Sequence, residues 1–239
     1  MTNLPMTSPG KFIQDVRVLI FDLDGTLIDS KLDLALAVNA TMRHMGKPEL
    51  DHERVYSYVG NGAPVLMQRA LGPDASEADC QRGLDFFLRF YREHMLDNTA
   101  PYPGVREGLK ALEFLPMAVL TNKPVRVSQL ILDGLGLGKH FRYVYGGNSF
   151  ETKKPDPFGV HKLLGDFGAA PREAMIVGDS EVDVQTARNA AVWACGVTYG
   201  LGSHRFAEFP PDVLIDSLTE LGALVGKNGA APTLRKSET

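Results

Sequence analysis

Two aspartates separated by one residue follow a dense apolar run near the start of the chain. The run at residues 16–21 is typical of a buried strand, and Asp22 and Asp24 come directly after it. Gly25 then permits a sharp turn of the backbone. Open parallel sheets bind ligands at the carboxyl ends of their strands, and two close carboxylates repel each other unless a cation or a shared proton relieves them. This pair therefore indicates a site of chemistry or metal binding.

Two further polar segments follow at predicted strand ends. Thr121 and Asn122 come after a strand predicted at 117–120, and a helix is predicted next, so the backbone amides form an anion-binding corner. Lys153 and Lys154 stand before a proline-stiffened segment, and we favour Lys154 as the fixed cation because it adjoins Pro155. Threonine and asparagine are also common turn residues, and adjacent lysines are more often solvated. Neither segment decides the function by itself.

A second acidic pair ends another predicted strand. Asp179 follows the strand expected at 175–177, and Asp183 lies four residues further on, on the same side of a helix that starts promptly. Each of the two alone would be interpreted as a helix cap. Together with Asp22 and Asp24 they form an oxygen-rich cluster that suits Mg²⁺, which takes one or two carboxylates and keeps waters and substrate phosphate.

The order of predicted elements explains how these residues meet. Four helices span roughly residues 31–98, whereas strands alternate with helices from residue 104 onward, which is typical of a parallel sheet covered on both faces. We predict a Rossmann-like α/β core at 15–29 and 104–225, an inserted helical cap at 30–103, a flexible leader at 1–14 and a tail at 226–239. Because the cap is inserted beside Asp22, we expect it to act as a lid, the alternative being that it only adds stability.

Composition limits the classes of function. The 239 residues allow one large or two small domains, and the formal net charge of −4 with scattered lysine and arginine argues against a nucleic-acid partner. No apolar stretch is long enough for a membrane span, and the N-terminus does not resemble a secretory signal. Two cysteines form neither a disulfide framework nor a zinc site. We expect a cytoplasmic enzyme, a monomer or homodimer, with no membrane or nucleic-acid partner.

In order and spacing, the four segments and the predicted cap resemble the haloacid dehalogenase-like phosphohydrolase superfamily. The resemblance covers about residues 16–225 and implies a Mg²⁺-dependent phosphatase that acts on a small phosphorylated metabolite. It implies that Asp22 attacks phosphorus to form an aspartyl phosphate and that Asp24 is the general acid and base. It also implies that Thr121, with the amides that follow it, holds phosphoryl oxygens and that Lys154 offsets negative charge.

The resemblance likewise implies a metal site. Mg²⁺ would be bound by Asp22, the backbone carbonyl of Asp24 and Asp179. Asp183 would orient a water or Lys154 rather than bind the metal directly.

Stretches around the cap loop Val59-Gly60-Asn61-Gly62-Ala63 and around Thr121, Lys154 and Thr198 are most similar to the phosphoglycolate phosphatase branch of the superfamily. That substrate carries a carboxylate as well as a phosphate. We predict substrate contacts from Gly60, Asn61, Gly62 and Asn122, the loop amides meeting the carboxylate when the lid closes. The alternative, of equal weight, is that these glycines only turn the chain.

Other activities of the same superfamily require different residues at these positions or leave the substrate open. A dehalogenase or a phosphonatase lacks the second acid, Asp24, and a β-phosphoglucomutase-like phosphomutase carries basic and hydroxyl residues where this cap loop is uncharged. A pyrophosphatase and a broad sugar phosphatase remain alternatives. A non-catalytic binding protein on the same fold is the alternative from another class, and the intact set of acids and Lys154 argues against it.

Overall fold

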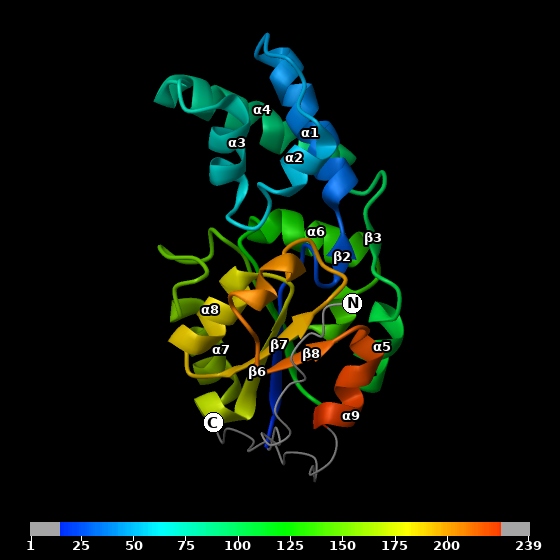
Figure 1. Cartoon of the computed structure of the whole chain (residues 1–239). Coiled ribbons are helices and arrows are strands. Elements are labelled where there is room, and N and C mark those ends of the chain that lie inside the picture. The colour runs from blue at the N-terminus through cyan, green and yellow to red at the C-terminus, as the bar shows by residue number, and fades with distance from the viewer. Residues whose placement is uncertain (1–14, 226–239) are drawn as a thin grey trace, which may run out of the picture.

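A six-stranded parallel sheet forms the centre of the lower body in Figure 1. The structure is a computed structural model that describes residues 15–225, so the predicted leader at 1–14 and tail at 226–239 lie outside it. The strand order is β5 (Tyr143–Tyr145), β4 (Met117–Leu120), β1 (Val18–Phe21), β6 (Ala174–Gly178), β7 (Trp193–Val197) and β8 (Val213–Ile215). Every neighbouring pair is parallel.

The alternation of side chains along β1 divides the core into two layers. Leu19 and Phe21 belong to one apolar cluster, and Val18 and Ile20 belong to the other, as expected when successive side chains point to opposite faces. The first cluster is covered by α5 (Val105–Ala111), α6 (Val125–Gly134) and α9 (Leu221–Val225). The second is covered by α7 (Phe158–Phe167) and α8 (Glu181–Asn189). The prediction of a Rossmann-like sheet covered on both faces is confirmed.

The four cap helices lie together at one end of this body (Figure 1). They are α1 (Lys31–His44), α2 (His52–Tyr56), α3 (Ala63–Leu71) and α4 (Glu77–His94), and all fall within the predicted range 30–103. Their two connections to the core pair as a short antiparallel ladder of β2 (Ile28–Asp29) and β3 (Ala100–Pro101). The sequence did not predict this ladder, because two-residue strands have no readable periodicity.

Helix α4 brings an aromatic pair to the underside of the cap. Ser76 caps the helix by accepting a hydrogen bond from the amide of Asp79. Phe87 and Tyr91, one turn apart, stack with ring centres 5.6 Å apart and are both buried. Tyr91 is thereby fixed where the cap meets the core.

The start of α8 and several 3₁₀ turns complete the fold. Helix α8 begins at Glu181, and Asp183 caps its start by accepting hydrogen bonds from the amide and hydroxyl of Ser180. A 3₁₀ turn, η4 (Leu218–Glu220), precedes α9. The other 3₁₀ turns are η1 (Gly138–His140), η2 (Pro171–Glu173) and η3 (Ser203–Ala207).

Within residues 15–225, no helix combines the length and apolar character that a membrane span requires.

Candidate active site

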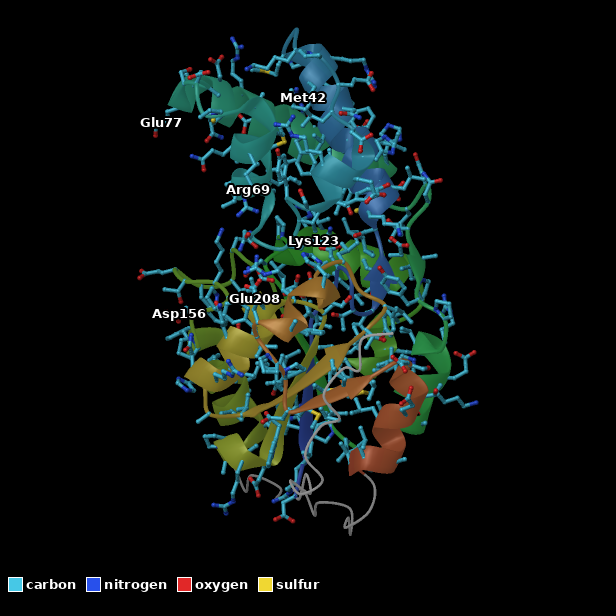
Figure 2. All side chains as sticks on the ribbon, in the orientation of Figure 1. Met42, Arg69, Glu77, Lys123, Asp156 and Glu208 are labelled. Atoms are coloured by element: carbon cyan, nitrogen blue, oxygen red, sulfur yellow. The ribbon has the colours of Figure 1, made fainter. Side chains whose placement is uncertain are left out.

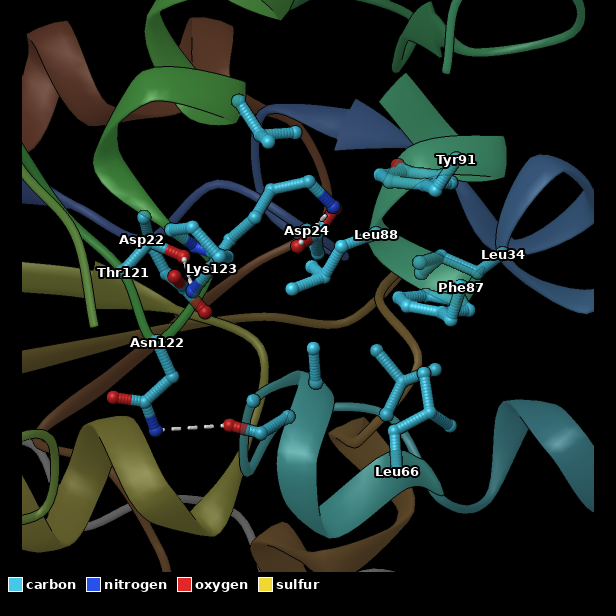
Figure 3. Close-up of a pocket in the computed structure, with 16 residues that line it drawn as sticks. Asp22, Asp24, Leu34, Leu66, Phe87, Leu88, Tyr91, Thr121, Asn122 and Lys123 are labelled. Atoms are coloured by element: carbon cyan, nitrogen blue, oxygen red, sulfur yellow. Dashed lines mark hydrogen bonds and ion pairs between the residues drawn. The ribbon is translucent and has the colours of Figure 1, made fainter. Parts of the chain in front are cut away.

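The carboxyl ends of β1, β4 and β6 lie side by side, and they bring the predicted site residues together. Because β1 pairs with both β4 and β6, the segments that begin at Asp22, Thr121 and Asp179 leave the sheet at one edge. Figure 3 shows Asp22, Asp24, Thr121 and Asn122 around one cavity between the core and the cap helices. This is the arrangement that the strand-end reasoning predicted.

Lys154 lies between two of the acids. Its Nζ is 2.9 Å from Oδ1 of Asp22 and 2.6 Å from Oδ1 of Asp183, and the lysine is only 5% exposed. Burial alone lowers the pKa of this ammonium, but attraction to Asp183 and Asp22 outweighs burial and holds the pKa above its usual range. Lys154 is therefore a fixed positive charge beside Asp22.

Asp179 completes a group of three carboxylates. One oxygen each from Asp22, Asp179 and Asp183 lies within 4.8 Å of the others. Asp179 accepts hydrogen bonds from the hydroxyl of Thr26 at 3.2 Å and the amide of Gly202 at 3.0 Å. Burial, followed by repulsion from the neighbouring carboxylates, raises the pKa of Asp179 above its ordinary value, and burial likewise raises that of Asp22. Three carboxylates, two of them buried and that of Asp22 half-buried, leave beside one lysine an excess of negative charge that suits a divalent cation.

The carboxylate of Asp24 points away from that group. Oδ1 accepts a hydrogen bond from the hydroxyl of Ser30 at 2.5 Å, and Nζ of Lys123 lies 2.9 Å and 3.0 Å from Oδ1 and Oδ2. Figure 3 draws the pair of Lys123 and Asp24 at the wall of the cavity. The two aspartates of the first segment thus have different lysine partners and face different surroundings.

The cap loop contacts the core through its carbonyl oxygens. The side-chain amide of Asn122 donates to the carbonyls of Gly60 and Lys154, both at 3.0 Å. The ammonium of Lys153 donates to the carbonyl of Asn61 at 2.9 Å. Asn122 therefore ties the core segments to the cap, and the predicted loop lies over the site.

Two cavities adjoin Asp22 and Asp24. The smaller, of about 50 Å³, lies under the cap and is mainly apolar. The larger, of about 430 Å³, extends toward Asp179, Glu181 and η3 and is also lined by Arg69 and Arg205. Figure 2 shows Arg69 on the lower side of the cap, near the boundary with the core where Lys123 lies.

Sequence reasoning missed several residues of this site. Lys123 lies in the same segment as Thr121 and Asn122, but nothing in the sequence indicated its pairing with Asp24, 99 positions away. Ser30 and Lys153 gave no signal for their contacts. Tyr91 falls on the apolar face of its helix, and that pattern predicts only burial.

Comparison with protein families matches residues 19–197 to the family described as haloacid dehalogenase-like hydrolase. The phosphoglycolate phosphatase of Pseudomonas syringae pv. tomato is 42% identical over 213 residues, which cover 86% of this chain and 78% of that protein. The phosphoglycolate phosphatase of Chromobacterium violaceum is 40% identical over 223 residues, covering 91% and 99%.

A solved structure has the same arrangement. The crystal structure described as a predicted phosphoglycolate phosphatase from Haemophilus somnus superposes with a TM-score of 0.83 at 33% identity, covering 87% of this chain and 97% of that one. The sequence comparisons and the structural comparison therefore both find similarity to proteins described as phosphoglycolate phosphatases.

Proposed function

Because the chain belongs to the haloacid dehalogenase-like hydrolase family, we propose that it is a phosphatase that hydrolyses a small phosphate monoester, 2-phosphoglycolate. The observation that carries the proposal is the position of Asp22 at the end of β1, 2.9 Å from the buried Lys154 and beside the anion-binding corner after β4. A carboxylate nucleophile needs the charge of the phosphoryl group to be neutralised, and this corner supplies the donors.

In the proposed reaction, an oxygen of Asp22 attacks phosphorus, and the bond from phosphorus to the ester oxygen breaks. The leaving oxygen takes a proton from the carboxyl of Asp24. A water then attacks the aspartyl phosphate and returns a proton to Asp24, which releases phosphate and restores Asp22. Ser30 and Lys123 hold the Asp24 side chain in position for both transfers.

The residues present fit a Mg²⁺ ion. The three clustered carboxylates carry more negative charge than Lys154 balances, and hard oxygen ligands are those that Mg²⁺ prefers. We propose Asp22, Asp179 and the backbone carbonyl of Asp24 as ligands, because the Asp24 carboxylate is already engaged by Lys123. Asp183 then positions Lys154. When bound, the metal supplies positive charge that offsets the phosphoryl oxygens.

The size of the smaller cavity supports a short leaving group. By the same measure of volume a single water needs about 10–15 Å³. The cavity of about 50 Å³ beside Asp24 therefore holds roughly four non-hydrogen atoms. The carboxymethyl arm of phosphoglycolate has that size, whereas a sugar would have to occupy the larger cavity that also adjoins Asp24.

Release of inorganic phosphate from a panel of esters tests the proposal. Purified protein with Mg²⁺ should hydrolyse 2-phosphoglycolate with a higher kcat/KM than hexose phosphates or pyrophosphate, and chelation of the metal should stop turnover. Preference for pyrophosphate or a hexose phosphate would replace the substrate assignment. Failure to hydrolyse any phosphate ester, in a protein that melts cooperatively, would refute the phosphatase assignment.

A further inference from the structure

Lys123 is a buried cation with hydrogen-bonding capacity left over. It is 7% exposed, its Nζ contacts both oxygens of Asp24, and it lies 4.6 Å from the centre of the Tyr91 ring (Figure 3). Burial alone lowers the pKa of Lys123, but attraction to Asp24 outweighs burial and holds it above the usual range. An ammonium has three donors, and the contacts to Asp24 use two at most.

Tyr91 provides a second donor beside it. The residue is 3% exposed, its hydroxyl lies beside the Lys123 ammonium, and within residues 15–225 no group accepts its proton. Burial raises the pKa of Tyr91 to about 12, so the phenol keeps its proton. A buried hydroxyl without a partner costs about 1–3 kcal/mol, which a phenylalanine at this position would avoid. The hydroxyl is explained if its partner is a ligand.

Both groups line the smaller cavity, which also reaches Asp22 and Asp24. Lys123 is the single cation among its lining residues, and the walls opposite are apolar, with Leu66, Phe87 and Leu88 from the cap. A negative group that enters this space loses its water and finds one ammonium and one phenol as donors. Desolvation strengthens such an interaction.

We propose that Lys123 and Tyr91 receive the carboxylate of the substrate, with the leaving oxygen of the phosphate toward Asp24. The substrate class is therefore a phosphate monoester whose short leaving group ends in an anion. This inference rests on the proposed phosphatase function and deepens it. It assigns the second anion to side chains of the core and of α4, whereas the sequence suggested the amides of the cap loop.

Arg69 is the competing cation that the cap supplies. It lies on α3 in the larger cavity, is exposed, and donates to the carbonyl of Tyr58 at 3.2 Å. An exposed guanidinium beside solvent discriminates weakly between charged and neutral ligands, because water screens the interaction. Arg69 is therefore the matched control, a cap cation that faces the other cavity.

The test compares 2-phosphoglycolate with ethyl phosphate, which has the same two-carbon skeleton without the carboxylate. The quantity measured is the ratio of the two kcat/KM values, because both substrates are alkyl esters and effects on Asp24 or on the phosphate site largely cancel in it. We expect this ratio to fall by at least about 30-fold in Lys123→Met, by about 5- to 10-fold in Tyr91→Phe, and to be retained in Arg69→Met, since each lost charged or neutral hydrogen bond costs about 1–3 kcal/mol. Lys123→Arg should keep more of the ratio than Lys123→Met.

Several outcomes would overturn the inference. Equal losses for both esters in Lys123→Met and Tyr91→Phe would show that these residues only position Asp24 or the cap. Collapse of the ratio in Arg69→Met alone would move the carboxylate to the larger cavity. A wild-type protein that hydrolyses both esters equally would refute carboxylate recognition and leave the phosphatase assignment standing, whereas one that hydrolyses neither would refute that assignment itself.

Thermal melting separates a structural role from recognition. Because no group accepts the proton of its hydroxyl, Tyr91→Phe should melt at the same or a higher temperature than wild type while the ratio falls. If Lys123→Met does not fold, the wild-type ratio and Tyr91→Phe still decide the question. A lower melting temperature of Tyr91→Phe with an unchanged ratio would count against the proposal.

Discussion

Two lysines divide the acids at the sheet edge between them. Lys154 pairs with Asp22 and Asp183, and Lys123 pairs with Asp24. The nucleophile and the acid of the proposed reaction are only two residues apart, yet each faces a separate cation. This division gives the two carboxyl groups different environments, as different roles require.

Replacement of Asp22 by asparagine should abolish turnover. The amide keeps the size of the side chain but is not a nucleophile, and kcat should fall by at least about 10³-fold, an increase of about 4 kcal/mol in the barrier. The fold should survive, because the variant removes a buried charge from an acidic cluster. Phosphate release and thermal melting are the measurements, and activity within tenfold of wild type would remove Asp22 as the nucleophile.

Replacement of Asp24 by asparagine should depend on the leaving group. General acid catalysis contributes about 10²–10⁴-fold where the leaving alkoxide is basic and much less where it is a stabilised phenolate. We expect a larger loss of kcat/KM for 2-phosphoglycolate than for p-nitrophenyl phosphate. Equal losses for the alkyl and aryl esters would contradict the acid role.

Residues that follow strands could be predicted, and residues that meet across the fold could not. Asp22, Thr121 and Asp179 are each marked in the sequence by the apolar strand before them. The contact of Lys123 with Tyr91 depends on how the cap docks on the core, which no local pattern encodes. The sequence favoured Lys154 over Lys153 because a neighbouring proline limits the backbone, and the structure places Lys154 beside Asp22.

At the scale of elements, the β2–β3 ladder and the cap loop set the position of the cap. The ladder joins the two connections, and Asn122 and Lys153 of the core hold the cap loop by hydrogen bonds.

The ends of helices could be predicted less well from the sequence. Ser217 and Glu220 have the spacing of a capping box, but the Ser217 hydroxyl accepts from the amide of Thr219 and the Glu220 carboxylate accepts from the amide of Asp216. A 3₁₀ turn therefore forms there instead.

Substitution of Gly62 by alanine should hinder closure of the cap. The added β-carbon would lie 3.1 Å from the carbonyl oxygen of Asn122, and the backbone φ of +87° already disfavours a side chain. We expect kcat/KM to fall by about tenfold for phosphoglycolate and aryl phosphates alike, about 1.4 kcal/mol. A loss confined to phosphoglycolate would favour carboxylate recognition by the loop amides.

Gly72 supplies the matched control at the other end of α3. Its φ is +91°, but an added β-carbon would have no atom within 4 Å. Gly72→Ala should therefore carry a similar backbone penalty, seen as a lower melting temperature, and retain the activity that Gly62→Ala loses. Similar activity losses in both variants would trace the defect to the helix rather than to the contact with Asn122.

At the scale of the whole molecule, the sheet fixes the acids and the cap encloses the leaving group. The order of strands and helices was readable because each segment carries its own apolar pattern. The size of the smaller cavity was not, since it depends on side chains from α1, α3, α4 and α6 together. The residues of the core thus indicate the type of reaction, and the fit between core and cap indicates the substrate.

The acidic cluster should couple the stability of the whole protein to pH and metal. Burial and mutual repulsion raise the pKa of Asp22 to about 6 and of Asp179 to about 8, from the ordinary aspartate value of 3.8. A carboxyl whose pKa is raised by folding stabilises the folded state while protonated, and that contribution is lost as pH rises through the raised value. The metal-free protein should therefore lose melting temperature as pH rises from about 4 to about 8.

Mg²⁺ should reverse that loss, because the cation replaces the missing positive charge. At 100 times its dissociation constant a ligand adds about 2.7 kcal/mol, which is roughly 5–10 °C for a protein of this size. The gain should be larger at the higher pH, where the carboxylates are ionised, and should shrink in Asp179→Asn, in which one carboxylate no longer titrates. Calorimetric scans with and without Mg²⁺, near the lower and the upper end of that pH range and in Ca²⁺-free buffers, measure this gain in melting temperature. A melting temperature that does not change with Mg²⁺ at the higher pH would show that protons neutralise the charge of the carboxylate cluster and that the cluster does not bind the metal.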